Sequence, residues 1–166
     1  MKKISSLQIA IDNEAREEKY YLAEAHRSQN PVVRKLLTHL AAEEFAHQKW
    51  IIERHDAMVE TGKWPEEITL TEADSTLAQT LGQLDYQKDE TKQHDDDDIA
   101  CLKKAAQFEM EAADFYFRLA REATTPKEAT FFAYLGKLEQ DHMASIRDSL
   151  AYLEDPEAYF AARAEH

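Results

Sequence analysis

One pattern of charged residues occurs twice in the chain, and it constrains the fold more than any other feature. In each copy a single glutamate is followed thirty positions later by Glu-x-x-His, and the second copy lies 95 positions after the first. The copies consist of Glu14, Glu44 and His47, and of Glu109, Glu139 and His142. Because every spacing is preserved, the sequence predicts two copies of one structural unit.

The segments around these residues align with one another without gaps, residues 11–56 on residues 106–151. Beyond the charged residues, the identical pairs include Tyr21 with Tyr116 and Pro31 with Pro126. A proline at the same place in both copies indicates the same turn, since the residue before proline avoids the helical region. We infer an internal duplication of a helical hairpin, with the two copies related by an approximate two-fold axis.

The composition favours helices over strands. Only 3 glycines and 4 prolines occur in 166 residues, and both residue types disfavour helix interiors. We expect long helices over about residues 5–29, 31–61, 95–125 and 126–153, and a short C-terminal helix in PEAYFAARA. The chain is thus predicted to be one all-α domain over residues 1–166, with hairpins at 5–61 and 95–153.

Residues 62–94 have no counterpart in the first copy and separate the two hairpins. They are predicted to form a long crossover between the second and third helices of an antiparallel four-helix bundle, with a short helix near residues 76–86. The acidic run HDDDD at 94–98 could hold a cation. We favour a helix start there, because the helix dipole stabilises acidic residues in the first turn.

The repeated charged residues fall on the apolar faces of their helices. Apolar residues step by threes and fours on both sides of each copy, as they do on helices that face a core. A buried carboxylate must be protonated, paired or bound to metal, and no Lys or Arg occupies these faces. Two divalent cations neutralise four glutamates. We therefore predict a metal centre made by Glu14, Glu44, His47, Glu109, Glu139 and His142.

Charge and cysteine content exclude several other functions. A net charge of −13 is unsuited to nucleic acid or to an anionic membrane surface. No apolar run is long enough to cross a bilayer, and the first residues lack a signal-type apolar core, so we expect a cytoplasmic protein. Cys101 is the only cysteine, which rules out an internal disulfide and indicates a small core residue.

Four segments that carry the repeated residues resemble the half-motifs of the ferritin-like superfamily, and most closely its rubrerythrin branch. They are IDNEAREEKYYLAEA, HLAAEEFAHQKW, QFEMEAADFYFRLA and YLGKLEQDHMAS. The resemblance implies a ferritin-like bundle that binds two iron ions through the six repeated residues, with manganese as an alternative. It also implies that Tyr21 and Tyr116 line the site, where a hydroxyl could donate a hydrogen bond or a proton. Ordinary core aromatics are the other interpretation of these tyrosines.

The chain departs from typical rubrerythrins in two ways. It lacks the four cysteines of a rubredoxin-like domain, so electrons would come from a separate donor protein such as a rubredoxin. Ala112 stands where rubrerythrins tend to have an additional glutamate, one turn after the third-helix ligand. Glu17 and Glu18 could supply an extra carboxylate, although we favour a solvated helix face for both.

The remaining histidines and the tryptophans have no duplicated partner. His26, His39, His55 and His94 are interpreted as surface or edge residues, with His55 the nearest of them to the predicted site. Trp50 and Trp64 are interpreted as packing residues.

Three functions remain open from the sequence. The first is a redox enzyme that reacts with peroxide or dioxygen at two metal ions. The second is oxidation of ferrous iron followed by storage or delivery, which requires a large hollow shell of subunits. The third is a metal-free helical interaction protein. A homodimer or a larger homo-oligomer is expected.

Overall fold

Two long helical hairpins form the fold. The structure is a computed structural model, and it describes residues 2–66 and 96–164. The helices in these residues are α1 (Lys2–Arg27), α2 (Pro31–Thr61), α4 (Asp96–Glu122), α5 (Pro126–Glu154) and α6 (Pro156–Ala164). All four predicted long helices and the short C-terminal helix are confirmed. The helix predicted near residues 76–86 lies outside the described residues, as does most of the crossover 62–94.

In both hairpins the turn ends with a polar N-cap residue followed by proline. The side chain of Asn30 accepts hydrogen bonds from the backbone N–H groups of Val32 (2.9 Å) and Val33 (3.3 Å), and Pro31 opens α2. Thr125 likewise accepts from the backbone N–H of Glu128 (3.2 Å), and Pro126 opens α5. A capping side chain satisfies N–H groups that the first helical turn leaves without partners, and proline has no N–H to satisfy.

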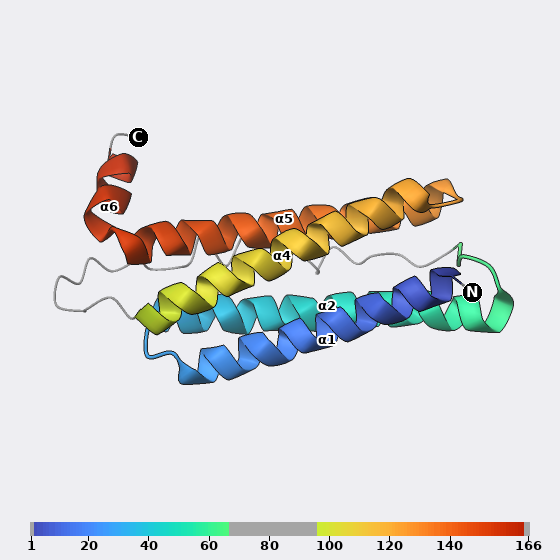
Figure 1. Cartoon of the computed structure of the whole chain (residues 1–166), viewed down its shortest axis with the longest axis horizontal. Coiled ribbons are helices and arrows are strands. Elements are labelled where there is room, and N and C mark those ends of the chain that lie inside the picture. Colours follow the sequence, from blue (N-terminus) through green and yellow to red (C-terminus); the bar gives the residue numbers. More distant parts are fainter. Residues whose placement is uncertain (1, 67–95, 165–166) are drawn as a thin grey trace.

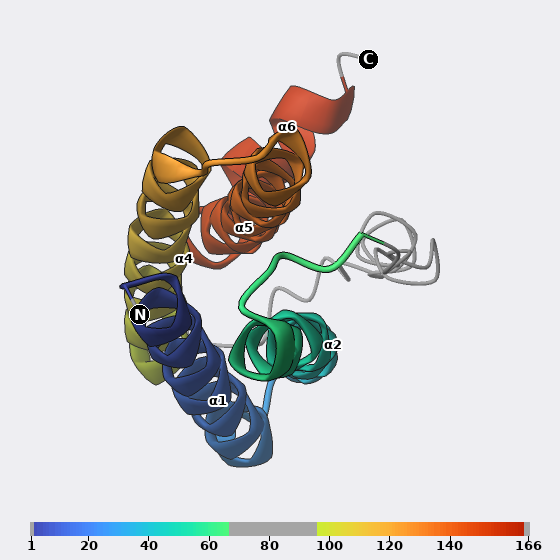
Figure 2. The same ribbon diagram turned by 90° about the vertical axis from the view of Figure 1, so that its right-hand side faces the viewer.

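The two hairpins pack against each other as an antiparallel four-helix bundle (Figure 1). Helix α1 lies beside α2 and α4 beside α5, and the view along the bundle shows the four helices around a common interior (Figure 2). The short helix α6 turns away from the bundle and stays in contact with α5, where the rings of Tyr152 and Tyr159 lie 5.7 Å apart. The predicted all-α four-helix architecture is therefore confirmed. Among the described helices, none has the length and apolar character that a membrane span requires.

The core consists of two apolar clusters with a polar layer between them. One cluster contains Tyr21, Leu37, Leu40, Leu102 and Ile146, and the buried Cys101 also belongs to it, as predicted. The other contains Leu7, Ile51, Tyr116, Phe132 and Leu135. Burying one such side chain contributes about 1.5–3 kcal/mol. The two clusters can thus offset the cost of placing charged groups in the layer between them.

The described part of the acidic run, residues 96–98, does begin a helix. Asp96, Asp97 and Asp98 occupy the first turn of α4, as predicted from the helix dipole. Asp98 is also fully buried, and its Oδ1 lies 2.9 Å from Nη2 of Arg27 at the end of α1. This ion pair joins the two hairpins at the end of the bundle where the first hairpin turns.

Replacing Asp98 by alanine is expected to lower the free energy of unfolding by about 1.5–3 kcal/mol, the contribution of a hydrogen bond to a charged group, while Arg27 keeps its ion pair with Glu24. Asp96→Ala is the matched control, since Asp96 is exposed in the same helical turn. It should change stability by less than about 0.5 kcal/mol. Urea unfolding measures both changes, and equal midpoints for the two variants would contradict this role of Asp98.

Candidate metal centre

The six predicted ligands meet in the polar layer of the bundle. Helix α1 supplies Glu14, α2 supplies Glu44 and His47, α4 supplies Glu109, and α5 supplies Glu139 and His142; all six are buried. Residues that are far apart in sequence thus converge because each occupies the inward face of its own helix. That these six residues bind metal stays a prediction. Whether they can do so depends on how closely their ligand atoms approach one another.

The ligand atoms form two groups that share two carboxylates. In each group, one atom from every residue lies within 4.8 Å of all the others. Glu44 and Glu139 belong to both groups, whereas Glu14 and His47 belong to one group and Glu109 and His142 to the other. Two neighbouring sites, each with three carboxylates and one imidazole, are therefore joined by two shared carboxylates. Each of the lone glutamates, Glu14 and Glu109, belongs to one group only.

The two imidazoles present the same ring nitrogen to the carboxylates. Nδ1 of His47 lies 3.1 Å from Glu139 Oε1 and 3.5 Å from Glu14 Oε2. Nδ1 of His142 lies 3.0 Å from Glu44 Oε1 and 3.3 Å from Glu109 Oε2. The rings are nearly parallel, with 6° between their planes and 5.5 Å between their centroids. Nδ1 is thus the atom through which either histidine can bind a metal.

The two tyrosines cross between the hairpins. The hydroxyl of Tyr21 in the first hairpin donates a hydrogen bond to Glu109 Oε1, and the hydroxyl of Tyr116 in the second donates to Glu14 Oε1. Both rings are buried in the apolar clusters. The tyrosines therefore match both interpretations from the sequence, because each ring packs in the core while its hydroxyl contacts a carboxylate of the centre.

Unsatisfied buried atoms test whether these residues suit a metal. Within the described part of the chain, no hydrogen bond reaches either oxygen of Glu44, either oxygen of Glu139, Glu14 Oε2, or either ring nitrogen of His47. A buried polar atom without a partner costs about 1–3 kcal/mol, and more if it is charged. None of the described lysines or arginines forms an ion pair with these carboxylates. Two divalent cations would satisfy both the charge and the lone pairs, so the residues fit a two-metal centre.

Two carboxyl groups and both imidazoles of the centre have raised pKa values, so they hold protons when no cation is present. Burial, together with the neighbouring Glu139, raises the pKa of Glu44 well above its usual value and that of Glu109 to about 8. Burial alone lowers the pKa of His47 and His142, but Glu14 and Glu109 respectively outweigh burial and raise it. A metal ion must therefore displace protons from these groups before it can bind.

Two further buried carboxylates lie at the centre: Glu17, which the sequence offered only as the less favoured alternative, and Glu43, which it did not single out. Glu17 is only 3% exposed, so its interpretation as part of a solvated helix face is wrong. It lies three positions after Glu14, which turns it toward the same interior, and burial and the charges of Glu44 and Glu14 raise its pKa. Glu43 is 5% exposed, and its ligand atom forms a third group with those of His47 and His142. Glu18, by contrast, is half-buried and accepts a hydrogen bond from Gln48 (2.5 Å).

The other histidines divide between the surface and the edge of the centre. His26 is exposed, and Nδ1 of the half-buried His55 contacts Asp56 Oδ1 at 3.2 Å. His39 does reach the edge, because its Nε2 lies 3.4 Å from Oε1 of Glu43. His94 lies outside the described residues.

Both tryptophans pack against other rings, as predicted. The ring of Trp50 lies 5.3 Å from that of His47, and the ring of Trp64 lies 5.5 Å from that of Phe131. Trp50 thus covers one of the predicted ligands.

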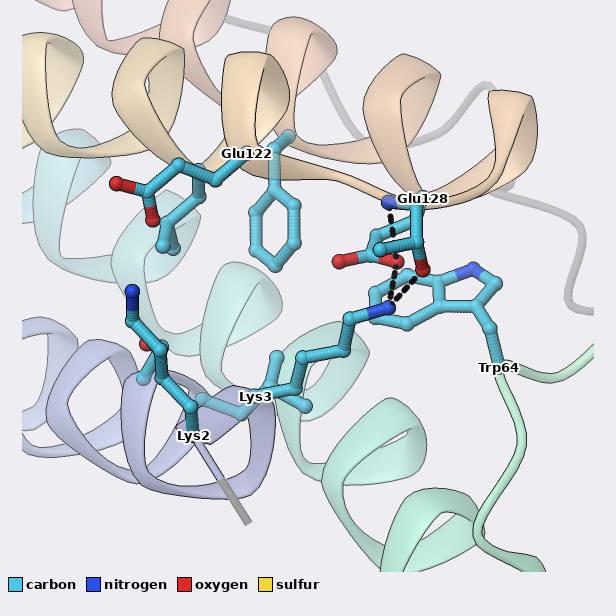
Figure 3. A pocket seen from close by; sticks show the side chains of 10 residues that line it. Lys2, Lys3, Trp64, Glu122 and Glu128 are labelled. Atoms are coloured by element: carbon cyan, nitrogen blue, oxygen red, sulfur yellow. Dashed lines mark hydrogen bonds and ion pairs between the residues drawn. The ribbon is translucent and has the colours of Figure 1, made fainter.

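A separate cavity of about 210 Å³ lies at the end of the bundle where α1 begins (Figure 3). Its lining includes the apolar side chains of Leu7, Trp64 and Phe132, and Nζ of Lys3 at its rim pairs with Oε2 of the buried Glu128 at 2.7 Å. None of the six predicted ligands lines it. Phe132, which lines the cavity, stacks on Tyr116, with 6.4 Å between the ring centroids.

Comparison with known families agrees with this geometry. The family model described as Rubrerythrin matches residues 5–150, which include all but the ends of the two hairpins and all six predicted ligands. Comparisons with curated proteins and with solved structures gave no significant match. With a family match over most of its length and the buried carboxylate and histidine cluster that this family implies, the chain belongs to the rubrerythrin family.

Proposed function

We propose that the chain is a di-iron redox protein that reduces hydrogen peroxide or dioxygen with electrons from a separate donor protein such as a rubredoxin. The observation that carries the proposal is the pair of four-residue groups that share Glu44 and Glu139. Shared carboxylates hold two ions close together, which suits two-electron chemistry better than the retention of independent ions. A cytoplasmic location stays part of the proposal.

The residues have distinct tasks in this function. Glu14 and His47 would hold one ion, Glu109 and His142 the other, and Glu44 and Glu139 both. When bound, two ferrous ions supply the two electrons that, with two protons, convert one hydrogen peroxide to two water molecules. The four carboxylates balance the charge of two divalent ions, and the apolar clusters exclude bulk water. The donor set accepts iron or manganese, and family membership favours iron.

The hydroxyls of Tyr21 and Tyr116 donate hydrogen bonds to the two lone glutamates, Glu109 and Glu14 respectively. Tyr116→Phe is expected to slow peroxide reduction by about 10- to 100-fold, because partners that orient ligands contribute by that factor. Metal content at saturation should stay at the wild-type level, since all six ligands remain. Stopped-flow oxidation of the ferrous protein measures the rate.

Tyr20→Phe is the matched control for the tyrosine prediction. The hydroxyl of Tyr20 donates to the backbone carbonyl of Cys101 (3.4 Å) and not to the centre. This variant should react at the wild-type rate. A Tyr116→Phe protein as fast as the Tyr20→Phe protein would show that the hydroxyl of Tyr116 has no part in the reaction.

The proposed function is tested by adding hydrogen peroxide to anaerobic ferrous protein and following the absorption of ferric iron. One peroxide should oxidise two ions per chain, and reduced rubredoxin should return the protein to the ferrous state for further turnovers. Iron that stays ferrous with both peroxide and air would refute the proposal. Size-exclusion chromatography separates it from iron storage, because storage requires a large shell and the proposed enzyme requires only a dimer or a small oligomer.

A further inference from the structure

Glu43 connects a predicted ligand to the edge of the bundle. Its Oε2 lies within hydrogen-bonding distance of Nε2 of the fully buried His142. Its Oε1 lies 3.4 Å from Nε2 of His39, whose side chain is 17% exposed. A buried carboxylate therefore lies between an interior imidazole and one that reaches the surface.

The contact with Glu43 determines which nitrogen of His142 is free to bind a metal. A neutral imidazole carries one proton, and a carboxylate beside Nε2 favours the tautomer in which Nε2 carries it. Nδ1 then keeps its lone pair, and it faces the oxygens of Glu44 (3.0 Å) and Glu109 (3.3 Å). The same contact fixes the rotation of the ring, as a carboxylate behind a metal-bound histidine does.

The duplication is broken at this position. Residue 138 is the counterpart of Glu43 in the second hairpin, and it is leucine, buried in an apolar cluster with Trp50. Accordingly, neither ring nitrogen of His47 makes a hydrogen bond within the described residues, although its ligand atom lies near those of Glu43 and His142. Nε2 of His142 therefore contacts a carboxylate, whereas Nε2 of His47 has no such hydrogen bond among the described residues.

We propose that Glu43 is a positioning residue that holds His142 for metal binding through Nδ1, so that the two metal positions have unequal affinities. The position of Glu109 and His142 is the tighter one, and that of Glu14 and His47 is the weaker. The proposal rests on the metal binding proposed above, and it assigns Glu43 a role through His142 and no direct bond to metal.

The test is a titration of the purified full-length protein with Co²⁺, followed by its visible absorption. The wild-type protein should bind two ions in two resolved steps. Glu43→Leu, which introduces the residue of the second hairpin, should lower the affinity of the tighter step by about 10- to 100-fold and leave the weaker step unchanged. Glu43→Gln should stay within about threefold of wild type, because an amide oxygen still accepts from Nε2–H.

Two further measurements separate positioning from a general structural effect. Thermal unfolding of the metal-free proteins should show that Glu43→Leu still unfolds in one cooperative step well above the temperature of the titration, with a midpoint lowered because the buried Nε2 of His142 loses its partner. Nitrogen–proton correlation spectra of the Zn²⁺-loaded protein should show a slowly exchanging Nε2–H of His142 in the wild type and in Glu43→Gln, and lose it in Glu43→Leu.

The outcomes distinguish this inference from the proposed function. A wild-type protein that binds no Co²⁺ would defeat both. Two ions bound to Glu43→Leu with wild-type affinities would overturn the positioning role and leave the metal centre intact. Equal losses in the Gln and Leu variants would overturn it too, because they would show that Glu43 is itself a ligand.

Discussion

Glu139→Ala is expected to remove both metal ions from the protein. The carboxylate of Glu139 belongs to both ligand groups, so each position loses one of its four donors. Affinity should fall by more than about 100-fold at both positions, since partners that contact only the ligands already cost 10- to 100-fold. Elemental analysis after gel filtration in metal-free buffer measures the loss.

Two further variants show whether the loss of both ions is specific to a carboxylate that belongs to both ligand groups. Glu14→Ala removes a donor from one group only, so this variant should keep about one ion per chain. Glu111→Gln removes an exposed glutamate two positions after Glu109 and should keep both ions. If Glu139→Ala and Glu14→Ala retained the same number of ions, the sharing of Glu139 between two positions would be wrong.

Each bound metal ion is expected to raise the melting temperature by roughly 8–16 °C. Free metal at 1,000 times its dissociation constant stabilises the folded state by about 4 kcal/mol, and each kcal/mol shifts the midpoint by about 2–4 °C in a chain of this length. Circular dichroism of helix unfolding, with either chelator or excess metal, measures the shift. The Glu139→Ala protein should show little of it.

The rise in melting temperature caused by metal binding should become larger as the pH rises from 6 to 8. In the metal-free protein the raised pKa of Glu109, about 8, means that the folded state holds a proton that the unfolded state has lost. Its contribution to stability is present at low pH and disappears as the pH rises through 8. The raised pKa values of His47 and His142 act in the same direction. Metal binding instead strengthens as these protons leave, so a shift that shrank over this range would contradict the electrostatics of the centre.

Most of the helical framework could be predicted from local signals. Asn30 with Pro31 and Thr125 with Pro126 are capping residues followed by proline, and each determines the start of a helix without any tertiary contact. The six predicted ligands were found because they recur at matched places on apolar faces.

The sequence did not reveal how the six predicted ligands divide between the two groups of ligand atoms. Spacing alone does not show that Glu44 and Glu139 belong to both groups while Glu14 and Glu109 each belong to one, since this depends on how the hairpins face each other. Glu43 escaped notice because it lies one residue from Glu44, about 100° around the helix, and has no duplicate. Glu17 was misjudged for a different reason: among many surface glutamates, only its spacing of three from Glu14 pointed inward.

The central claim, a two-metal centre between the hairpins, is tested most directly by titrating the metal-free protein with ferrous iron under anaerobic conditions. Equilibrium dialysis followed by iron analysis gives the number of ions bound per chain. Saturation at two ions per wild-type chain is the predicted result. Saturation at one ion, or binding that Glu139→Ala leaves unchanged, would contradict it.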